Sequence, residues 1–272
     1  MFNWVVFLTI IAICIPGIAF FIPTIGIMYE SIKQKLPATK KIPSVKKFIL
    51  ISIIQTFVFI SIAAAFGTAV INKVNLHAPL IKAFVNNKSI WLALQPKLIH
   101  TIIISAGGAI IFLMVYYLVV RPNLDAQTIK CMERLRMSVG IWGRIFYGGV
   151  VEEILCRWGL MTFFVWLGIL FLGDKNTMIL WTAIILSGVL FGIGHLPGYL
   201  TFGCKKTPAF ITSVIGLNLW AAIIFGWLFW HYGLWAAIIA HILFHLFWYP
   251  FDLYYQRKSL IHKTTKHEGT AI

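Results

Sequence analysis

Residues 142–172 read WGRIFYGGVVEEILCRWGLMTFFVWLGILFL, a hydrophobic run that carries Glu152, Glu153 and Arg157 near its middle. The run exceeds the ~20 apolar residues that an α-helix needs to cross the hydrocarbon core of a bilayer. A charged side chain at that depth costs roughly 2.5–3.5 kcal/mol, so three together indicate either tight mutual pairing or a function. The segment therefore predicts both a membrane span and the centre of a functional site.

The composition of the whole chain also indicates a membrane protein. Of its 272 residues, 60% are hydrophobic and 11% are charged, and the mean hydropathy is +0.88. Helices suit such a chain because they satisfy their backbone hydrogen bonds inside lipid. We predict an all-α, polytopic transmembrane bundle with seven spans, or eight if the weakly amphipathic stretch 79–96 re-enters the membrane. The seven windows are about 3–28, 48–72, 98–120, 142–172, 177–200, 209–230 and 233–254.

The net charge of +15 is concentrated in the connections between these windows. Alternate connections, beginning with 31–47 and including 121–144, carry 17 Lys and Arg residues, whereas the opposite side carries five. The positive-inside rule then places the N-terminus outside and the C-terminus in the cytoplasm. Anionic lipids are the expected partners of these charges, and nucleic acid is not, since no basic face lies free of membrane segments. The predicted location is a multi-pass protein of a prokaryotic plasma membrane.

Three histidines occur in later hydrophobic segments and supply partners for a buried acid. At 1.5 Å per residue, Glu152, His195, His241 and His245 all fall roughly 8–20 Å from the cytoplasmic ends of their helices. Segments that run in opposite directions therefore bring polar groups to one depth. Polar residues with unrelated structural roles would not be expected to lie at the same depth.

The spacing within each segment suggests separate roles for these residues. Glu153 and Arg157 are an i, i+4 pair on one helix face and form a structural ion pair, while Glu152 is rotated by about 100° and has no local partner. A carboxylate without a charge partner is available as a general base. His241 and His245 also share a face. His195 ends the segment Phe191-Gly192-Ile193-Gly194-His195, whose two glycines would let neighbouring backbones approach closely.

Other hydrolytic chemistries lack their signatures in this sequence. The helical zinc-protease motif HExxH is absent, and Ser187 lies outside a Gly-x-Ser-x-Gly context. The four cysteines show no metal-ligand spacing and no disulfide framework. A glutamate and histidines acting on water remain, with or without a bound metal.

These residues resemble the three motifs of the CPBP family, which comprises CAAX-prenyl endopeptidases, bacteriocin-processing or self-immunity proteins and related Abi membrane proteases. The motifs are Glu152-Glu153-x-x-x-Arg157, Phe191-x-x-x-His195 and His241-x-x-x-His245, and the resemblance covers about 142–250. It divides the chain into N-terminal transmembrane helices (1–120), a CPBP-like catalytic core (121–254) and a basic cytoplasmic tail (255–272).

The resemblance also implies a role for each residue. Glu152 would activate water with His195, His241 and His245 would stabilise the oxyanion or help to hold a metal, and Glu153, Arg157 and Phe191 would orient them. His245 stands where the prenyl endopeptidases more often have Asn, which weakens the case for CAAX specificity. The cofactor is left open between none and zinc, for which His195, His241 and His245 would be the ligands.

The implied function is an intramembrane endopeptidase, of either the glutamate or the metalloprotease type. Its substrate would be a small membrane-associated or lipidated peptide or protein. The alternative is a non-catalytic bacteriocin self-immunity or membrane scaffold protein that keeps the motifs as structure. A proton-coupled transporter is less favoured because the sequence has no inverted repeat.

Overall fold

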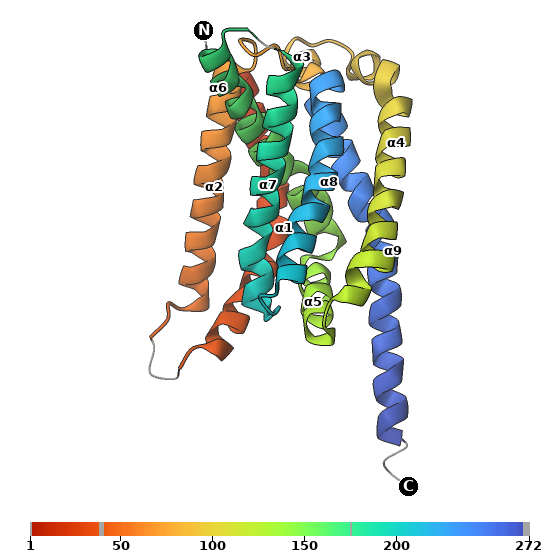
Figure 1. The fold of residues 1–272 in the computed structure, drawn as a ribbon. Helices are drawn as coiled ribbons and strands as arrows, with labels where there is room; N and C mark the ends of the chain where they lie inside the picture. The colour runs from red at the N-terminus through yellow and green to blue at the C-terminus, as the bar shows by residue number, and fades with distance from the viewer. Residues whose placement is uncertain (1, 38–40, 175, 269–272) are drawn as a thin grey trace.

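The computed structural model of the protein describes residues 2–37, 41–174 and 176–268, with side chains as far as residue 258. Every regular element within these ranges is a helix, which confirms the predicted all-α fold (Figure 1). In chain order the elements are α1 (Trp4–Lys35), α2 (Val45–Val70), α3 (Pro79–Val85), α4 (Ile90–Met114), η1 (Val115–Val120), η2 (Arg121–Asn123), α5 (Ala126–Gly143), η3 (Arg144–Glu152), η4 (Ile154–Met161), α6 (Thr162–Leu172), α7 (Thr177–Phe202), α8 (Pro208–Tyr232) and α9 (Leu234–Glu268).

Seven helical runs of the described chain are long and apolar enough to span a membrane, as the hydropathy of the sequence predicts. The stretch 79–96 forms the short helix α3 and the beginning of α4, so no eighth crossing arises there. The N-terminus lies at one end of the bundle and the C-terminus at the other (Figure 1). The runs are Trp4–Lys35, Val45–Val70, Ile90–Asn123, Ala126–Leu172, Thr177–Phe202, Pro208–Tyr232 and Leu234–Lys258.

The segment 121–144 is largely helical, so its prediction as a charged connection was wrong. α5 begins at Ala126 and continues through η3 and η4 into α6 as one helical run. Arg136 and Arg144, which were counted as loop charges, are only 7% and 3% exposed. Counting every Lys and Arg of 121–144 as exposed therefore overestimates the positive charge on the surface at this end of the bundle.

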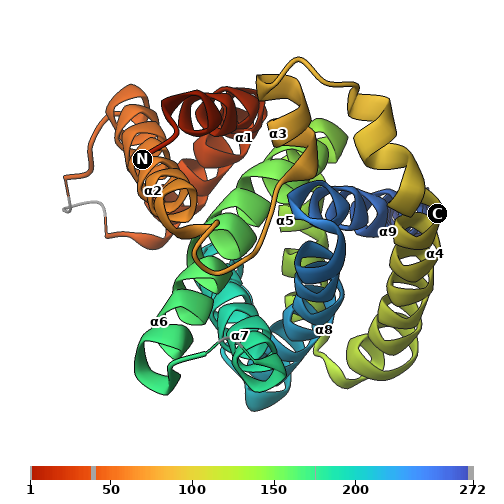
Figure 2. The ribbon, with the colours of Figure 1, turned by 90° about the horizontal axis from the view of Figure 1, so that it is seen from above.

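The long run from α5 to α6 crosses the middle of the bundle when the molecule is seen from above (Figure 2). Its central part, η3 and η4, packs against α1 and α2 from the N-terminal half and against α7 and α9 from the C-terminal half. The segment with the buried acids is thus enclosed by helices from both halves of the sequence. This position places Glu152 and Glu153 inside the bundle.

Side-chain caps mark where most of the helices begin. Asn3, Ser44, Ser89, Asn176 and Thr207 each accept a hydrogen bond from the backbone N–H three residues further on. Such bonds satisfy an N–H that lacks a partner within the helix. The sequence thus defines the helix starts locally, before any contact between helices.

Asp125 caps α5 in the same way and lies outside the membrane-spanning runs. It accepts hydrogen bonds from the Thr128 backbone and hydroxyl, at 3.1 and 2.7 Å. The Thr128 side-chain bond, aided by the Lys205 ammonium at 3.5 Å, holds the pKa of Asp125 below its usual value. This contact ties the start of α5 to the connection between α7 and α8.

One of the two glycines before His195 permits a close helix contact, and the other does not. A Cβ on Gly192 would lie 2.8 Å from the backbone of Ile215, so α7 and α8 approach closely there as predicted. A Cβ on Gly194 would meet nothing within 4 Å, because this residue lines a cavity instead. The expectation of a close approach was therefore wrong for Gly194.

A break in the helical run at Gly140 separates α5 from the segment that carries the acids. Its backbone angles, φ +63° and ψ 173°, belong to a region that is essentially reserved for glycine. Beyond the break, Arg144 donates to the Arg136 carbonyl from Nε and Nη2, at 3.2 and 2.7 Å. Arg144 thereby satisfies a carbonyl that the interrupted helix leaves without its ordinary partner.

Gly140→Ala is expected to destabilise the protein by about 1–3 kcal/mol, because alanine does not tolerate these backbone angles. The measurement is the thermal unfolding midpoint of the purified protein in detergent. Gly107→Ala is the matched control, since Gly107 lies within α4 and a Cβ there has open space. Equal midpoints for the two variants would contradict the prediction.

Candidate active site

The acidic motif lies on an unusual helical segment. η3 and η4 are π-helical and are separated only by Glu153, whereas the spacing of the motif residues predicts an α-helix. Stretches of π-helix are rare and are frequent at functional sites. The wider helix still keeps Glu153 and Arg157 on one face, and it turns Glu152 toward a cavity.

Glu153 and Arg157 form the predicted ion pair, and a third group joins them. Arg157 Nε lies 3.2 Å from Glu153 Oε2, and both side chains are fully buried. Nδ1 of His241, on α9, lies 2.7 Å from the other carboxylate oxygen. The Arg157 guanidinium also lies between the rings of Phe191 and Phe225, 5.5 Å from each centroid. Glu153 therefore orients His241, a link that spacing along the chain could not predict.

His195 is oriented by the backbone of its own helix. Its Nδ1 lies 2.8 Å from the Phe191 carbonyl and donates a hydrogen bond to it, because a carbonyl oxygen can only accept. The Phe191 ring packs edge-on against the imidazole, with 4.6 Å between the ring centroids. The Phe191 carbonyl thus fixes which nitrogen of His195 faces the cavity.

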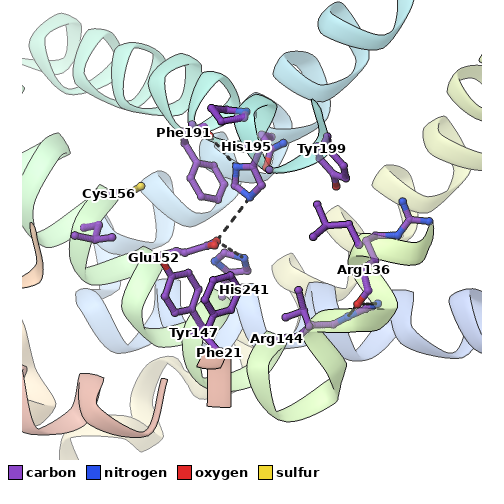
Figure 3. Close-up of a pocket in the computed structure, with 18 of the residues that line it drawn as sticks. Phe21, Arg136, Arg144, Tyr147, Glu152, Cys156, Phe191, His195, Tyr199 and His241 are labelled. Atoms are coloured by element: carbon purple, nitrogen blue, oxygen red, sulfur yellow. Dashed lines mark hydrogen bonds and ion pairs between the residues drawn. The ribbon is translucent and has the colours of Figure 1, made fainter. Parts of the chain in front are cut away.

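A single oxygen of Glu152 faces both histidines. Glu152 Oε2 lies 3.9 Å from Nε2 of His195 and 3.8 Å from Nε2 of His241 (Figure 3). Both distances exceed a direct hydrogen bond, so the three groups surround a point that a small polar molecule could contact. The structure therefore brings together the acid and two of the three histidines singled out in the sequence.

His245 lies beside this group and makes no described ion pair with Glu152. Its ring stacks on His241, with 4.8 Å between the centroids. A Cβ on Gly148 would lie 2.5 Å from Nε2 of His245, so the glycine provides the room that the imidazole occupies. His245 lines the same cavity and supports His241 from the side opposite Phe225, which stacks on His241 at 4.7 Å.

The cavity has a volume of about 660 Å³ and is bounded by helices from both halves of the chain. Its wall is mostly apolar, with Glu152, His195, His241 and His245 gathered at one part of it. α1 and α2 contribute Phe21, Ile25, Met28 and Phe59, among others. An apolar cavity with a few convergent polar groups is the usual form of a binding site for an organic ligand.

The described residues contain no group of three His, Cys, Asp or Glu side chains arranged to hold a metal ion. His195 and His241 each direct Nε2 toward Glu152, while His245 stacks on His241.

The comparison with known families agrees with the motifs. Residues 135–247 match the model of the family described as type II CAAX prenyl endopeptidase Rce1-like. No curated protein and no solved structure shows a significant match to the chain. The matched segment contains all three motifs, and the predicted resemblance to the CPBP family is confirmed.

Proposed function

We propose that this chain, whose residues 135–247 match the family model of type II CAAX prenyl endopeptidases, is an intramembrane endopeptidase that uses Glu152 to activate water. One observation carries the proposal. A carboxylate oxygen faces two imidazole nitrogens at 3.8 and 3.9 Å on the wall of a largely apolar cavity. Such a group combines a base, proton carriers and a low-dielectric surrounding.

Hydrolysis in this geometry begins with a water bound between Glu152 and His195. The water donates one hydrogen bond to the carboxylate and one to Nε2 of His195, which is the acceptor because Nδ1 carries the proton. As the oxygen attacks the scissile carbonyl, Glu152 takes one proton and later delivers it to the leaving amine. The bond between the carbonyl carbon and the amide nitrogen breaks, and the product that contains the carbonyl carbon ends in the new carboxyl group.

His241 stabilises the oxyanion in a way that differs from the sequence-based hypothesis. With Nδ1 donating to Glu153, a neutral His241 presents a lone pair at Nε2 and cannot donate there. A second proton, taken up from water before the attack and released after the products leave, would turn Nε2 into a donor toward the oxyanion, and Glu153 would stabilise the resulting positive charge. His245 acts through its stacking on His241, so we assign it a positioning role.

The shape and composition of the cavity favour a substrate with an apolar part. Helix α1 lines one wall with apolar side chains and α2 adds Phe48 and Phe59 beside three polar residues, while Glu152 and the histidines lie on η3, α7 and α9. A membrane-associated or lipidated peptide would place its apolar portion against the first wall and its scissile bond near Glu152. The two walls match the two parts of such a substrate.

We also propose that the end of the bundle with the C-terminus faces the cytoplasm. The end of α1, the start of α2 and the turn 203–207 lie at this end (Figure 1). Without the buried Arg136 and Arg144, this side still holds 15 Lys and Arg residues against five on the other. The positive-inside rule thus favours the same orientation after the correction.

The test is cleavage of a fluorescent, prenylated peptide with a C-terminal CAAX sequence by the purified protein in liposomes. We expect cleavage that survives a metal chelator, because the described donors do not converge on a metal. Loss of cleavage with the chelator and its return with Zn²⁺ would overturn the glutamate mechanism. No cleavage of this peptide or of other membrane-associated peptides would favour the non-catalytic immunity or scaffold function.

A further inference from the structure

A second buried charge cluster lines the cavity and takes no part in the proposed hydrolysis. Arg136 of α5 donates to both carboxylate oxygens of Asp252, from Nε at 3.0 and 3.1 Å and from Nη2 at 2.8 Å. Arg144 of η3 donates to Asp252 from Nη2 at 2.8 Å. Asp252, on α9, is 2% exposed. Its position within the last apolar window is the one feature of the sequence that points to this cluster.

The cluster carries one more positive charge than its partners neutralise. Asp252 is the only carboxylate paired with either guanidinium in the described part of the chain. The aromatic rings of Tyr116, Trp248 and Tyr249 pack on the two arginines and are uncharged. A buried charge without a counter-ion is strongly unfavourable, so the surplus calls for an anionic partner.

Each guanidinium also has a nitrogen that could bind that partner. Nη1 of Arg136 and Nη1 of Arg144 are buried and have no hydrogen-bond acceptor. Both residues line the cavity that holds Glu152 and His195. The two clusters thus have opposite charge imbalances. Arg136, Arg144 and Asp252 contain one more guanidinium than carboxylate, whereas Glu152, Glu153 and Arg157 contain one more carboxylate than guanidinium.

The separation of the two clusters suits a short stretch of peptide. Figure 3 shows Arg136 and Arg144 on the side of the pocket opposite Glu152 and His195. Arg144 precedes Glu152 by eight residues, which is no more than roughly 12 Å along a helix. An extended chain advances about 3.3–3.6 Å per residue, so three to four residues cover this distance.

We propose that Arg136 and Arg144 bind the C-terminal carboxylate of the peptide substrate and so position the scissile bond at Glu152. The inference rests on the proposed function, because the peptide is what the hydrolytic groups in this cavity would act on. One carboxylate supplies the single negative charge that the cluster lacks, and a guanidinium is the group that binds a carboxylate most strongly. The two arginines would therefore make the protein selective for peptides that end close to the cleavage site.

The experiment compares a prenylated CAAX peptide that has a free C-terminal carboxylate with the same peptide as its C-terminal amide. For the wild-type protein in zwitterionic liposomes we expect kcat/KM to be about 10- to 100-fold higher for the acid, the usual effect of hydrogen bonds to a charged group. Arg136→Gln and Arg144→Gln are expected to reduce this ratio at least about fivefold. The ratio of kcat/KM for the acid to that for the amide is measured within each variant, so a general loss of active protein does not change it.

Two further variants separate recognition from structure. Asp252→Asn disrupts the same buried cluster but keeps both cations, so the preference for the acid should persist or increase. Arg121→Gln is the matched control, because Arg121 pairs with Glu133 at 3.2 Å and does not line the cavity. It should leave both the activity and the ratio unchanged. A fall of the ratio in Asp252→Asn equal to that in Arg136→Gln would assign the cluster a purely structural role.

Binding keeps the inference testable if cleavage fails. Fluorescence anisotropy of the labelled acid and amide with the Glu152→Gln variant measures recognition without hydrolysis. Equal binding of the two peptides would overturn the carboxylate site, whether or not the wild type cleaves them. If the two peptides bind equally, and their binding changes only when anionic lipids are added, the two arginines would instead be assigned to a lipid phosphate. Preferential binding of the acid without cleavage would uphold the carboxylate site and reject the protease.

Discussion

Glu152→Gln is expected to lower kcat/KM for peptide cleavage by at least about 10²–10⁴-fold, because the amide keeps the shape of the side chain but cannot accept a proton from water. The carboxylate has no ion-pair partner other than the two histidines in the described structure. Its replacement should therefore leave the unfolding midpoint in detergent nearly unchanged. The measurement is cleavage of the prenylated peptide by liposomes that contain equal amounts of folded protein.

Two histidine variants accompany this measurement. His195→Ala should lose cleavage to a similar degree, since it removes the second acceptor of the attacking water. His231→Ala is its control, because His231 lies exposed near the end of α8 and does not line the cavity. Cleavage by Glu152→Gln at more than about a tenth of the wild-type rate would reject Glu152 as the base.

Glu153→Leu is expected to cost about 3–5 kcal/mol of stability, because it leaves the fully buried Arg157 without its counter-ion. The substitution also removes the acceptor that holds Nδ1 of His241. Cleavage should therefore be lost in addition to stability. The measurement is the unfolding midpoint in detergent together with cleavage activity.

The double variant Glu153→Leu/Arg157→Leu separates the two effects. Replacing a buried pair by apolar side chains is often neutral or stabilising, so the midpoint should recover most of the loss. Cleavage should not recover, since His241 still lacks its partner. Recovery of both would show that Glu153 serves only to neutralise Arg157.

The sequence predicted much of the fold because the membrane constrains it strongly. A span needs about 20 apolar residues, and the run 142–172 or the run 177–200 can satisfy that only as helices. The motif residues could be identified from the sequence for the same reason, because polar residues such as Glu152 and His195 are rare within apolar spans. The structure brings them to one cavity, within 3.9 Å of each other.

What the sequence could not supply depends on packing between distant segments. The choice of Glu153 as the partner of His241 follows from how α9 lies against η3 and η4, 88 residues away along the chain. The π-helical geometry of η3 likewise has no signature in the spacing of the acids. Arg136 and Arg144 were assigned to a loop because loop charge and buried charge look alike until the helix that contains Asp252 is placed.

The positions of the partners along the chain have a consequence for biosynthesis. His241 and Asp252 lie on α9, the last helix of the described chain, whereas Glu153, Arg136 and Arg144, which they contact, all precede α6. A nascent chain that has inserted six helices therefore holds Glu153 without His241 and two arginines without their aspartate. The two clusters therefore cannot form before α9 is synthesised, and a premature stop before α9 would yield a chain in which both clusters lack a partner.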